Sequence, residues 1–170
     1  MAVLEILKIG HPTLTKKAAP IQQIDKEIIR IAQDMVETMY AAPGLGLSAP
    51  QVNISQRLIT IDLSIGERKE DLIILVNPEI ISREGKIIQE EGCLSVPKIY
   101  EKVARPSKVV LRGLALDGKE KVIEAENLLA RVFCHEIDHL NGKLFIEWLS
   151  PLKKNLIKKK FKKQMDAGEK

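Results

Sequence analysis

Two histidines and a glutamate stand close together in the run His135-Glu136-Ile137-Asp138-His139. On a helix, histidines four residues apart project from the same face about one turn apart, which suits two ligands of one metal ion. Glu136 is turned by about 100° from His135, so it can reach a water on the metal without being a ligand itself. The run therefore predicts metal-assisted hydrolysis, in which a Lewis acid works beside a base. The alternative is two histidines that bind no metal.

A third metal ligand is expected elsewhere in the chain, because a catalytic tetrahedral site takes three protein ligands and keeps one position open for water. Cys93 is the best candidate. It lies in a turn-like segment after a predicted strand, where Gly92 would let the backbone approach closely, and a thiolate suits a soft or borderline divalent metal. Without the histidines, an ordinary buried cysteine would be the better interpretation of Cys93. Cys134 is turned away from His135 on the helix, so we interpret it as a packing residue.

The composition fits one globular domain over residues 1–170, with 45% hydrophobic and 29% charged residues. The net charge of +4 is uneven, because the stretch 151–170 holds eight lysines against Asp166 and Glu169. This stretch therefore predicts a basic C-terminal helix or tail and argues against DNA as the partner of the whole protein. The N-terminus does not resemble a signal peptide and no apolar run is long enough to span a bilayer, so a cytoplasmic protein is expected.

The apolar pattern predicts a helix over 25–40 and a half-buried strand over 57–63. A second strand is expected over 72–76, stopped by Asn77 and Pro78. Two stretches resemble hairpins because each has a glycine-containing turn between apolar runs. These stretches are 79–88 and 109–125.

The histidine motif falls on a predicted helix that starts near Leu128 and ends at Gly142. Ser150 and Pro151 then start a C-terminal helix. Its apolar stripe consists of Leu152, Leu156, Ile157, Phe161 and Met165. Because the strand signals favour antiparallel pairing, we predict an α+β fold with mostly antiparallel sheets packed around a central metal-binding helix, and with a C-terminal helix.

Three motifs, in the order in which they occur, resemble those of the peptide deformylase family. They are Gly44-Leu45-Gly46-Leu47-Ser48-Ala49-Pro50-Gln51, Glu91-Gly92-Cys93-Leu94-Ser95 and His135-Glu136-Ile137-Asp138-His139-Leu140-Asn141-Gly142. The resemblance extends over nearly the whole chain, and three motifs in order are far more specific than any one of them.

The resemblance implies the metal ligands and the base. The family's cysteine ligand falls on Cys93 and its two histidine ligands fall on His135 and His139, in agreement with the spacing argument. The general base falls on Glu136. The family binds one divalent metal ion at these ligands, with Fe(II) expected in vivo and zinc, nickel or cobalt able to occupy the same site.

The resemblance also implies the groups that meet the substrate. The oxyanion donors fall on the Gln51 side chain and the Leu94 backbone N–H, which are donors of the required kind. The family binds its peptide in extended form along the first motif, so Leu45 and Gly46 are expected to offer backbone hydrogen bonds, and Gly92 is also expected at the substrate. The implied reaction removes the formyl group from N-formylmethionine at the start of nascent bacterial or organellar polypeptides.

Two positions bear on how closely this chain follows the family pattern. Ser48 stands where the family usually has alanine, which adds a hydroxyl near the substrate groove. Arg131 lies one helical turn before His135, near where relatives often place an apolar residue facing the methionine pocket. It leaves open what lines that pocket.

Three other hypotheses accompany this reading. An HExxH metallopeptidase that cuts internal peptide bonds would use similar catalytic groups, but such enzymes usually complete the metal shell with a carboxylate or a histidine rather than a residue like Cys93. A non-enzymatic domain with a structural metal is disfavoured by Glu136 beside the ligands. The basic C-terminal helix could also dock on ribosomal RNA or protein near the emerging chain, although charge runs more often form a solvated surface.

Overall fold

A computed structural model describes residues 2–166 of the chain. It contains three α-helices, seven strands and four short 3₁₀ turns in this described range. The strands are β1 (Gly46–Ser48), β2 (Leu58–Ile61), β3 (Ile73–Glu84), β4 (Ile87–Cys93), β5 (Val96–Arg105), β6 (Lys108–Leu114) and β7 (Glu120–Glu126). The helices are α1 (Lys26–Ala41), α2 (Asn127–Leu140) and α3 (Pro151–Asp166), and the 3₁₀ turns are Pro12–Thr15, Ala49–Val52, Lys69–Asp71 and Phe145–Trp148.

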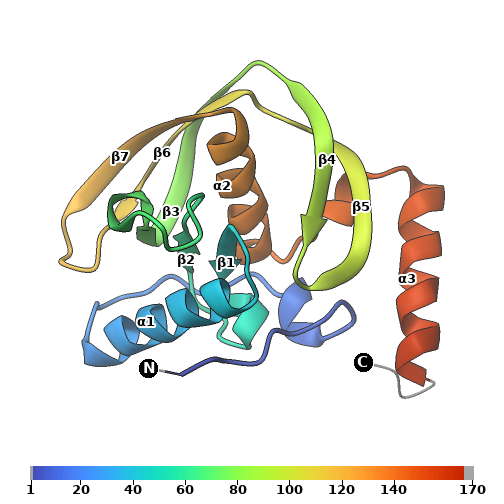
Figure 1. Ribbon diagram of the computed structural model, residues 1–170, viewed down its shortest axis with the longest axis horizontal. Coiled ribbons are helices and arrows are strands. Elements are labelled where there is room, and N and C mark those ends of the chain that lie inside the picture. The colour runs from blue at the N-terminus through green and yellow to red at the C-terminus, as the bar shows by residue number, and fades with distance from the viewer. Residues whose placement is uncertain (1, 167–170) are drawn as a thin grey trace.

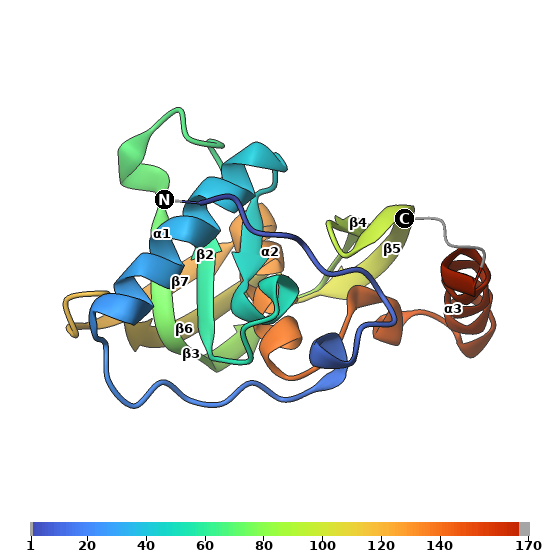
Figure 2. The same ribbon diagram turned by 90° about the horizontal axis from the view of Figure 1, so that it is seen from below.

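The strands form two antiparallel sheets, one of five strands in the order β1-β2-β3-β6-β7 and one made of β4 and β5. Helix α2 lies between the larger sheet and the β4–β5 pair (Figure 1). In the view of Figure 2, β4, β5 and α3 lie on the opposite side of the molecule from the turn that joins β6 and β7. The predicted α+β fold with antiparallel sheets, a central helix and a C-terminal helix is confirmed.

Helix α1 begins and ends close to the predicted bounds. The Asp25 side chain accepts a hydrogen bond from the backbone N–H of Ile28 at 3.0 Å, which satisfies one of the free donors of the first turn. Ala32, Met35 and Met39 are fully buried on one face of this helix. They pack with residues of β1 and β2 in one apolar cluster, which fixes α1 against one face of the larger sheet.

Strand β2 is buried on both faces, so the prediction of a half-buried strand over 57–63 is wrong about its burial. Leu58 packs in the apolar cluster with α1, whereas Ile59 and Ile61 pack in the cluster with α2. The alternation indicated a solvated face, but the polar residues in it, Thr60 and Asp62, are fully buried as well. This burial holds β1, the neighbour of β2, between the two helices.

Asn77 does not stop the second predicted strand. Strand β3 continues to Glu84 through a register shift between Val76 and Glu79, where Asn77 has a φ of 51°. The Asn77 side chain binds the backbone of Ile21 through both of its polar atoms, at 2.8 and 2.9 Å. These bonds hold the left-handed turn, so the strand bends here instead of ending.

The predicted hairpin over 79–88 is wrong, because the two strands around Gly85 belong to different sheets. β3 pairs with β6, whereas β4 pairs with β5. Gly85, at a φ of 70°, turns the chain from one sheet to the other. The hairpin over 109–125 is confirmed as β6 and β7, which pair along their whole length.

Helix α2 ends at Leu140, and Gly142 follows it at a φ of 76° as predicted. Helix α3 begins at Pro151, also as predicted, but its apolar stripe divides. Ile157 and Phe161 are buried in a cluster with β5 and the Phe145–Trp148 turn. Leu152 and Leu156 remain exposed, at 70% and 58%. The Met165 side chain and residues 167–170 lie outside the described residues, within which no helix is long and apolar enough to cross a membrane.

Candidate metal centre and active site

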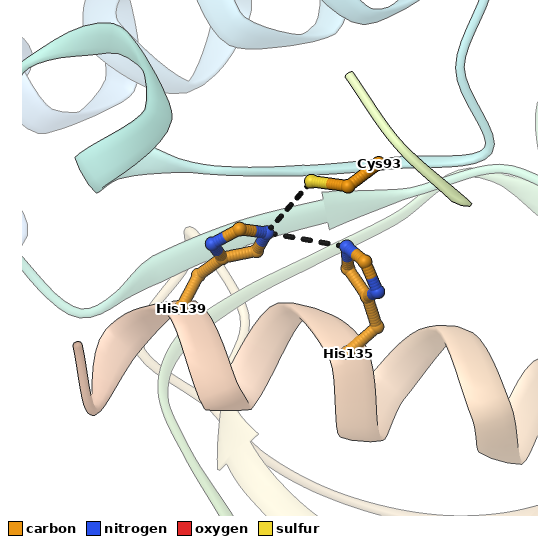
Figure 3. Close-up of side chains that lie close together, drawn as sticks. All are labelled: Cys93, His135 and His139. Carbon is orange, nitrogen blue, oxygen red and sulfur yellow. Dashed lines mark hydrogen bonds between the residues drawn. The ribbon is translucent and has the colours of Figure 1, made fainter. Parts of the chain in front are cut away.

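Three side chains predicted to bind metal converge in the structure (Figure 3). His135 and His139 project from one face of α2, and Cys93 reaches them from the end of β4. Cys93 Sγ lies 3.3 Å from His139 Nε2, and the two Nε2 atoms are 3.2 Å apart. All three ligand atoms lie within 4.8 Å of one another. The sequence spacing and the tertiary structure therefore identify the same cluster.

The spacing of these atoms fits a tetrahedral metal ion. Bond lengths of about 2.0–2.3 Å and tetrahedral angles place neighbouring ligand atoms about 3.3–3.6 Å apart. The two short separations in the cluster lie close to this range. One sulfur and two imidazole nitrogens leave a fourth position free, as a catalytic site requires. The residues present therefore fit a divalent metal of the kind that the resemblance implies.

The orientation of His135 is set by Glu91, a residue that the sequence argument did not single out. His135 Nδ1 lies 2.8 Å from Glu91 Oε2, and both side chains are buried. An ionised carboxylate only accepts hydrogen bonds, so Nδ1 carries the proton and Nε2 is left with its lone pair for a metal. Within one sequence the only signal for this role was the place of Glu91 in the second motif, two residues before Cys93.

Arginines surround the Glu91 carboxylate. Arg105 donates to it at 3.0 and 2.7 Å, and Arg131 donates to it at 2.9 Å. Burial by itself would raise the pKa of Glu91, but the hydrogen bonds from His135 and Arg105 outweigh burial and hold the pKa well below its usual value. Glu91 is therefore a buried anion. Arg105 also pairs with Asp138 at 2.6 Å, which gives Asp138 a structural role.

Glu136 lies beside the cluster with its carboxylate enclosed. The residue is only 3% exposed, and its Oε1 atom has no hydrogen-bond partner within the described residues. Burial raises the pKa of Glu136 to about 7. A buried carboxylate oxygen without a hydrogen-bond partner lowers the stability of the folded state. Such an oxygen is suited to taking a proton from a water or a substrate.

Gly46 makes room for this carboxylate. A Cβ atom built on Gly46 would lie 2.7 Å from Glu136 Oε2 and 3.0 Å from Val132 Cγ1. The backbone of β1 therefore approaches α2 more closely than any side chain would allow. This contact requires a glycine at position 46 of the first motif.

Gln51 reaches the cluster with its amide in a defined orientation. Its Oε1 atom accepts hydrogen bonds from the backbone N–H and the hydroxyl of Ser48, both at 3.0 Å. Its Nε2 atom therefore points the other way, to Ser95 Oγ at 3.2 Å and Cys93 Sγ at 3.7 Å. The departure at Ser48 thus adds a hydrogen bond to a site residue. The Gln51 amide N–H is directed to the edge of the ligand cluster.

One cavity of about 510 Å³ contains the predicted substrate-contacting groups. The site residues that line it are Leu45, Gly46, Gln51, Gly92, Cys93, Leu94, His135 and Glu136. Its wall also includes two exposed residues for which the sequence predicted no role in the site, Tyr100 at 65% and Leu128 at 45%. The Tyr100 ring lies directly over Gly92, where an added Cβ would meet it at 2.6 Å. Gly92 therefore leaves room for the ring in its present position.

A buried base, three convergent ligand side chains and a cavity with a directed amide define a metal-dependent hydrolase. The family model of polypeptide deformylase matches residues 3–155. Peptide deformylase of Syntrophobacter fumaroxidans is 47% identical over 165 residues, 97% of each chain, and that of Halothermothrix orenii is 56% identical over 147 residues, 86% of this chain and 94% of the relative. The crystal structure of a peptide deformylase from Legionella pneumophila, 42% identical, covers 98% of both chains with a TM-score of 0.90.

The chain belongs to the polypeptide deformylase family. The family consists of metal-dependent hydrolases that remove the N-terminal formyl group from nascent peptides, and the resemblance stated from the three motifs is confirmed. The alternative of an HExxH metallopeptidase is not favoured.

The contact between Gly46 and Glu136 generates a prediction. Gly46→Ala places a methyl group against the Glu136 carboxylate and must displace it, and a displacement of about 1 Å at a reacting group can cost about 100-fold in rate. We expect the turnover of a formylated peptide to fall by at least that factor while the protein remains folded. Gly113→Ala is the matched control, because its added Cβ would be crowded by the Val76 carbonyl oxygen at 3.2 Å in the larger sheet, away from the cavity. Equal losses in the two variants would contradict the prediction.

Proposed function

We propose that this chain hydrolyses the formyl group of N-formylmethionyl peptides at the cluster of Cys93, His135 and His139, with Glu136 as the proton shuttle. One observation carries the proposal. The buried Glu136 carboxylate has an oxygen without a partner, and it faces the cavity beside three side chains that fit a metal ion. A carboxyl with a pKa near 7 can both take and return a proton at neutral pH.

The steps assigned to the chain follow from these positions. A divalent metal at the cluster supplies Lewis-acid polarisation and brings the pKa of water toward neutrality. Glu136 takes a proton from the attacking water and later returns it to the amine that leaves when the C–N bond of the formamide breaks. Glu91 keeps the His135 ring in the tautomer that presents Nε2 to the metal. The products are formate and a peptide with a free α-amine.

Gln51 and Leu94 are the proposed donors to the developing oxyanion. The Gln51 amide is held from behind by Ser48, so its N–H needs little reorganisation when charge develops on the formyl oxygen. Leu94 follows Cys93 directly and lines the same cavity, which puts its backbone N–H at the right place in the chain for this role. Two such donors lower the barrier because they are oriented before the reaction begins.

The peptide is proposed to bind as an extended strand through Leu45, Gly46 and Gly92. Strands β1 and β4 are both edge strands in the described structure, since β1 pairs only with β2 and β4 only with β5. The cavity lies between them and is lined by residues of both. An extended peptide can therefore use backbone groups that the sheets leave free.

Fe(II) is the metal that we propose for the cell. One thiolate and two imidazoles accept several borderline divalent ions, so zinc, nickel and cobalt are compatible with the same ligands. The choice among them depends on metal availability and handling as well as on coordination.

The principal test is formate release from formyl-Met-Ala-Ser by anaerobically prepared protein, with metal analysis on the same sample. We expect one formate for each peptide consumed and about one metal ion per chain. Glu136→Gln keeps the shape of the side chain and removes the base, so its kcat should fall by about 100- to 10,000-fold. The variant should retain its metal.

An unformylated Met-Ala-Ser peptide and a longer internal peptide serve as controls for that test. Release of internal fragments without formate would overturn the assignment in favour of a metallopeptidase. Metal binding without any deformylation, unchanged in Glu136→Gln, would favour a structural metal domain.

Gln51 and Ser48 allow the oxyanion role to be tested separately. Gln51→Ala should raise the barrier by about 2.7–4 kcal/mol, seen as a fall in kcat. Ser48→Ala removes one of the two hydrogen bonds to Gln51 Oε1 and keeps the other, so we expect a much smaller loss of kcat with little change in KM. If Gln51→Ala raised KM and left kcat unchanged, Gln51 would be a ground-state binding group instead.

We further propose that residues 1–170 act as one deformylase domain in the compartment where formylated chains are made, which is the bacterial cytoplasm or an organelle. In this proposal the basic helix α3 docks on the ribosome. Lys153, Lys154 and Lys158 pair with Glu101 and Glu147 of the domain itself. A further group of lysines on α3 is exposed and available for phosphate groups of RNA, namely Lys159, Lys160, Lys162 and Lys163.

Replacing these four lysines together by glutamine should weaken co-sedimentation with ribosomes by about 10-fold or more at moderate salt, because each lost phosphate contact reduces the salt-dependent affinity. Turnover of formyl-Met-Ala-Ser should stay unchanged. The matched control replaces four exposed lysines elsewhere, namely Lys17, Lys26, Lys69 and Lys119. Docking through α3 would be excluded if both variants sedimented like the unmodified protein.

A further inference from the structure

Among the residues that the structure describes, Arg131 is the one buried charged residue at the cavity that the proposed reaction does not use. It lies one helical turn before His135 on the same face of α2, and its side chain is only 6% exposed. Its Nη1 atom donates to Glu91 Oε1 at 2.9 Å, and its Nη2 atom donates to the carbonyl of Ile87 at 2.8 Å. One guanidinium thus binds both the first residue of β4 and the carboxylate that precedes the ligand Cys93.

The Glu91 carboxylate is held by four hydrogen bonds, two on each oxygen. Oε1 accepts from Arg105 and Arg131, whereas Oε2 accepts from Arg105 and His135. The two arginines therefore determine the plane of the carboxylate, and that plane determines where the His135 ring stands. Without Arg131, Oε1 would keep a single donor and β4 would lose its bond from α2 at Ile87.

The balance of buried charge around Glu91 also depends on Arg131. Arg105 faces two carboxylates, those of Glu91 and Asp138, so by itself it leaves one negative charge uncompensated. Arg131 supplies the second positive charge. Because buried ions are tolerated only when they are paired and hydrogen-bonded, the two arginines and two acids form one interdependent set.

We infer that Arg131 is a positioning residue for the metal site, which holds Glu91 and β4 so that His135 and Cys93 keep the spacing of a metal shell. The inference rests on the proposed metal-binding function of the cluster. It also explains why an arginine can stand at the wall of the substrate cavity. Arg131 lines the cavity, but its guanidinium is bound to Glu91 and Ile87 and so has its donors occupied by the protein itself.

The test measures metal affinity rather than turnover. Co(II) is bound to the metal-free protein, its thiolate-to-metal absorption is recorded, and the dissociation constant is obtained by competition with a chelator. We expect Arg131→Met, which keeps an unbranched side chain of similar length, to weaken Co(II) binding by about 10- to 100-fold, the usual effect of losing a group that orients a ligand. Arg131→Lys should recover part of the loss, because it keeps the charge but not the two-pronged geometry.

A double-mutant cycle with Glu91→Gln separates positioning from general weakening of the fold. If Arg131 acts through Glu91, the double variant should bind Co(II) within about 2-fold of Glu91→Gln alone, since interacting residues are not additive. If Arg131→Met does not fold, the same double-mutant cycle is measured with Arg131→Lys in its place. Additive losses would overturn the inference, and so would wild-type Co(II) affinity in Arg131→Met.

Two controls complete the experiment. Tyr40→Phe removes a hydrogen bond to the buried Asp62, away from the cavity, so it should lower stability without changing Co(II) affinity. His135→Ala removes a proposed ligand and tests the site itself. If the unmodified protein failed to bind Co(II), or His135→Ala left binding intact, the proposed metal site would fail. If the unmodified protein and Arg131→Met bind Co(II) equally well and His135→Ala does not bind it, only the role of Arg131 is refuted.

Discussion

The hydrogen-bonded carboxylate of Glu91 is the interaction on which the site depends. It joins β4 to α2, because its partners Arg131 and His135 lie on the helix and Glu91 itself lies two residues before Cys93. A buried carboxylate with fewer donors would be protonated or would move toward water. Because it is fully paired, it stays ionised and fixes the orientation of the His135 ring. The spacing between β4, which carries Cys93, and α2, which carries His135 and His139, is therefore set by these charged hydrogen bonds.

The rest of the fold surrounds this network with apolar packing. Ile59, Ile61 and Phe133 are fully buried in the apolar cluster that packs α2 against the larger sheet. A second cluster fixes α1 on the other face of that sheet, and a third packs β5 against Phe145 and α3. Low polarizability around the charges strengthens each hydrogen bond and also makes any unpaired group costly. The Oε1 atom of Glu136, which faces no hydrogen-bond partner within the described residues, is one such costly group.

The site also depends on the close approach of strand backbones to neighbouring side chains. Gly46 lets β1 come against Glu136, and Gly92 leaves room for the Tyr100 ring across the β4–β5 pair. Both glycines belong to edge strands that border the same cavity. The absence of two side chains therefore shapes the groove as much as the residues that line it, and it leaves free backbone groups where an extended peptide would bind.

The sequence by itself determined the local part of this protein. Helical spacing put His135, Glu136 and His139 in one place, since their relation depends only on the geometry of a single helix. The apolar pattern predicted the bounds of α1, glycines predicted the end of α2 and the hairpin of β6 and β7, and the motifs identified Cys93 and Gln51. The tertiary structure decided what depends on distant pairing. It placed β3 and β4 in different sheets, buried both faces of β2, and brought Glu91 together with Arg105 and Arg131, because contacts between residues far apart in the chain leave no periodic signal in one sequence.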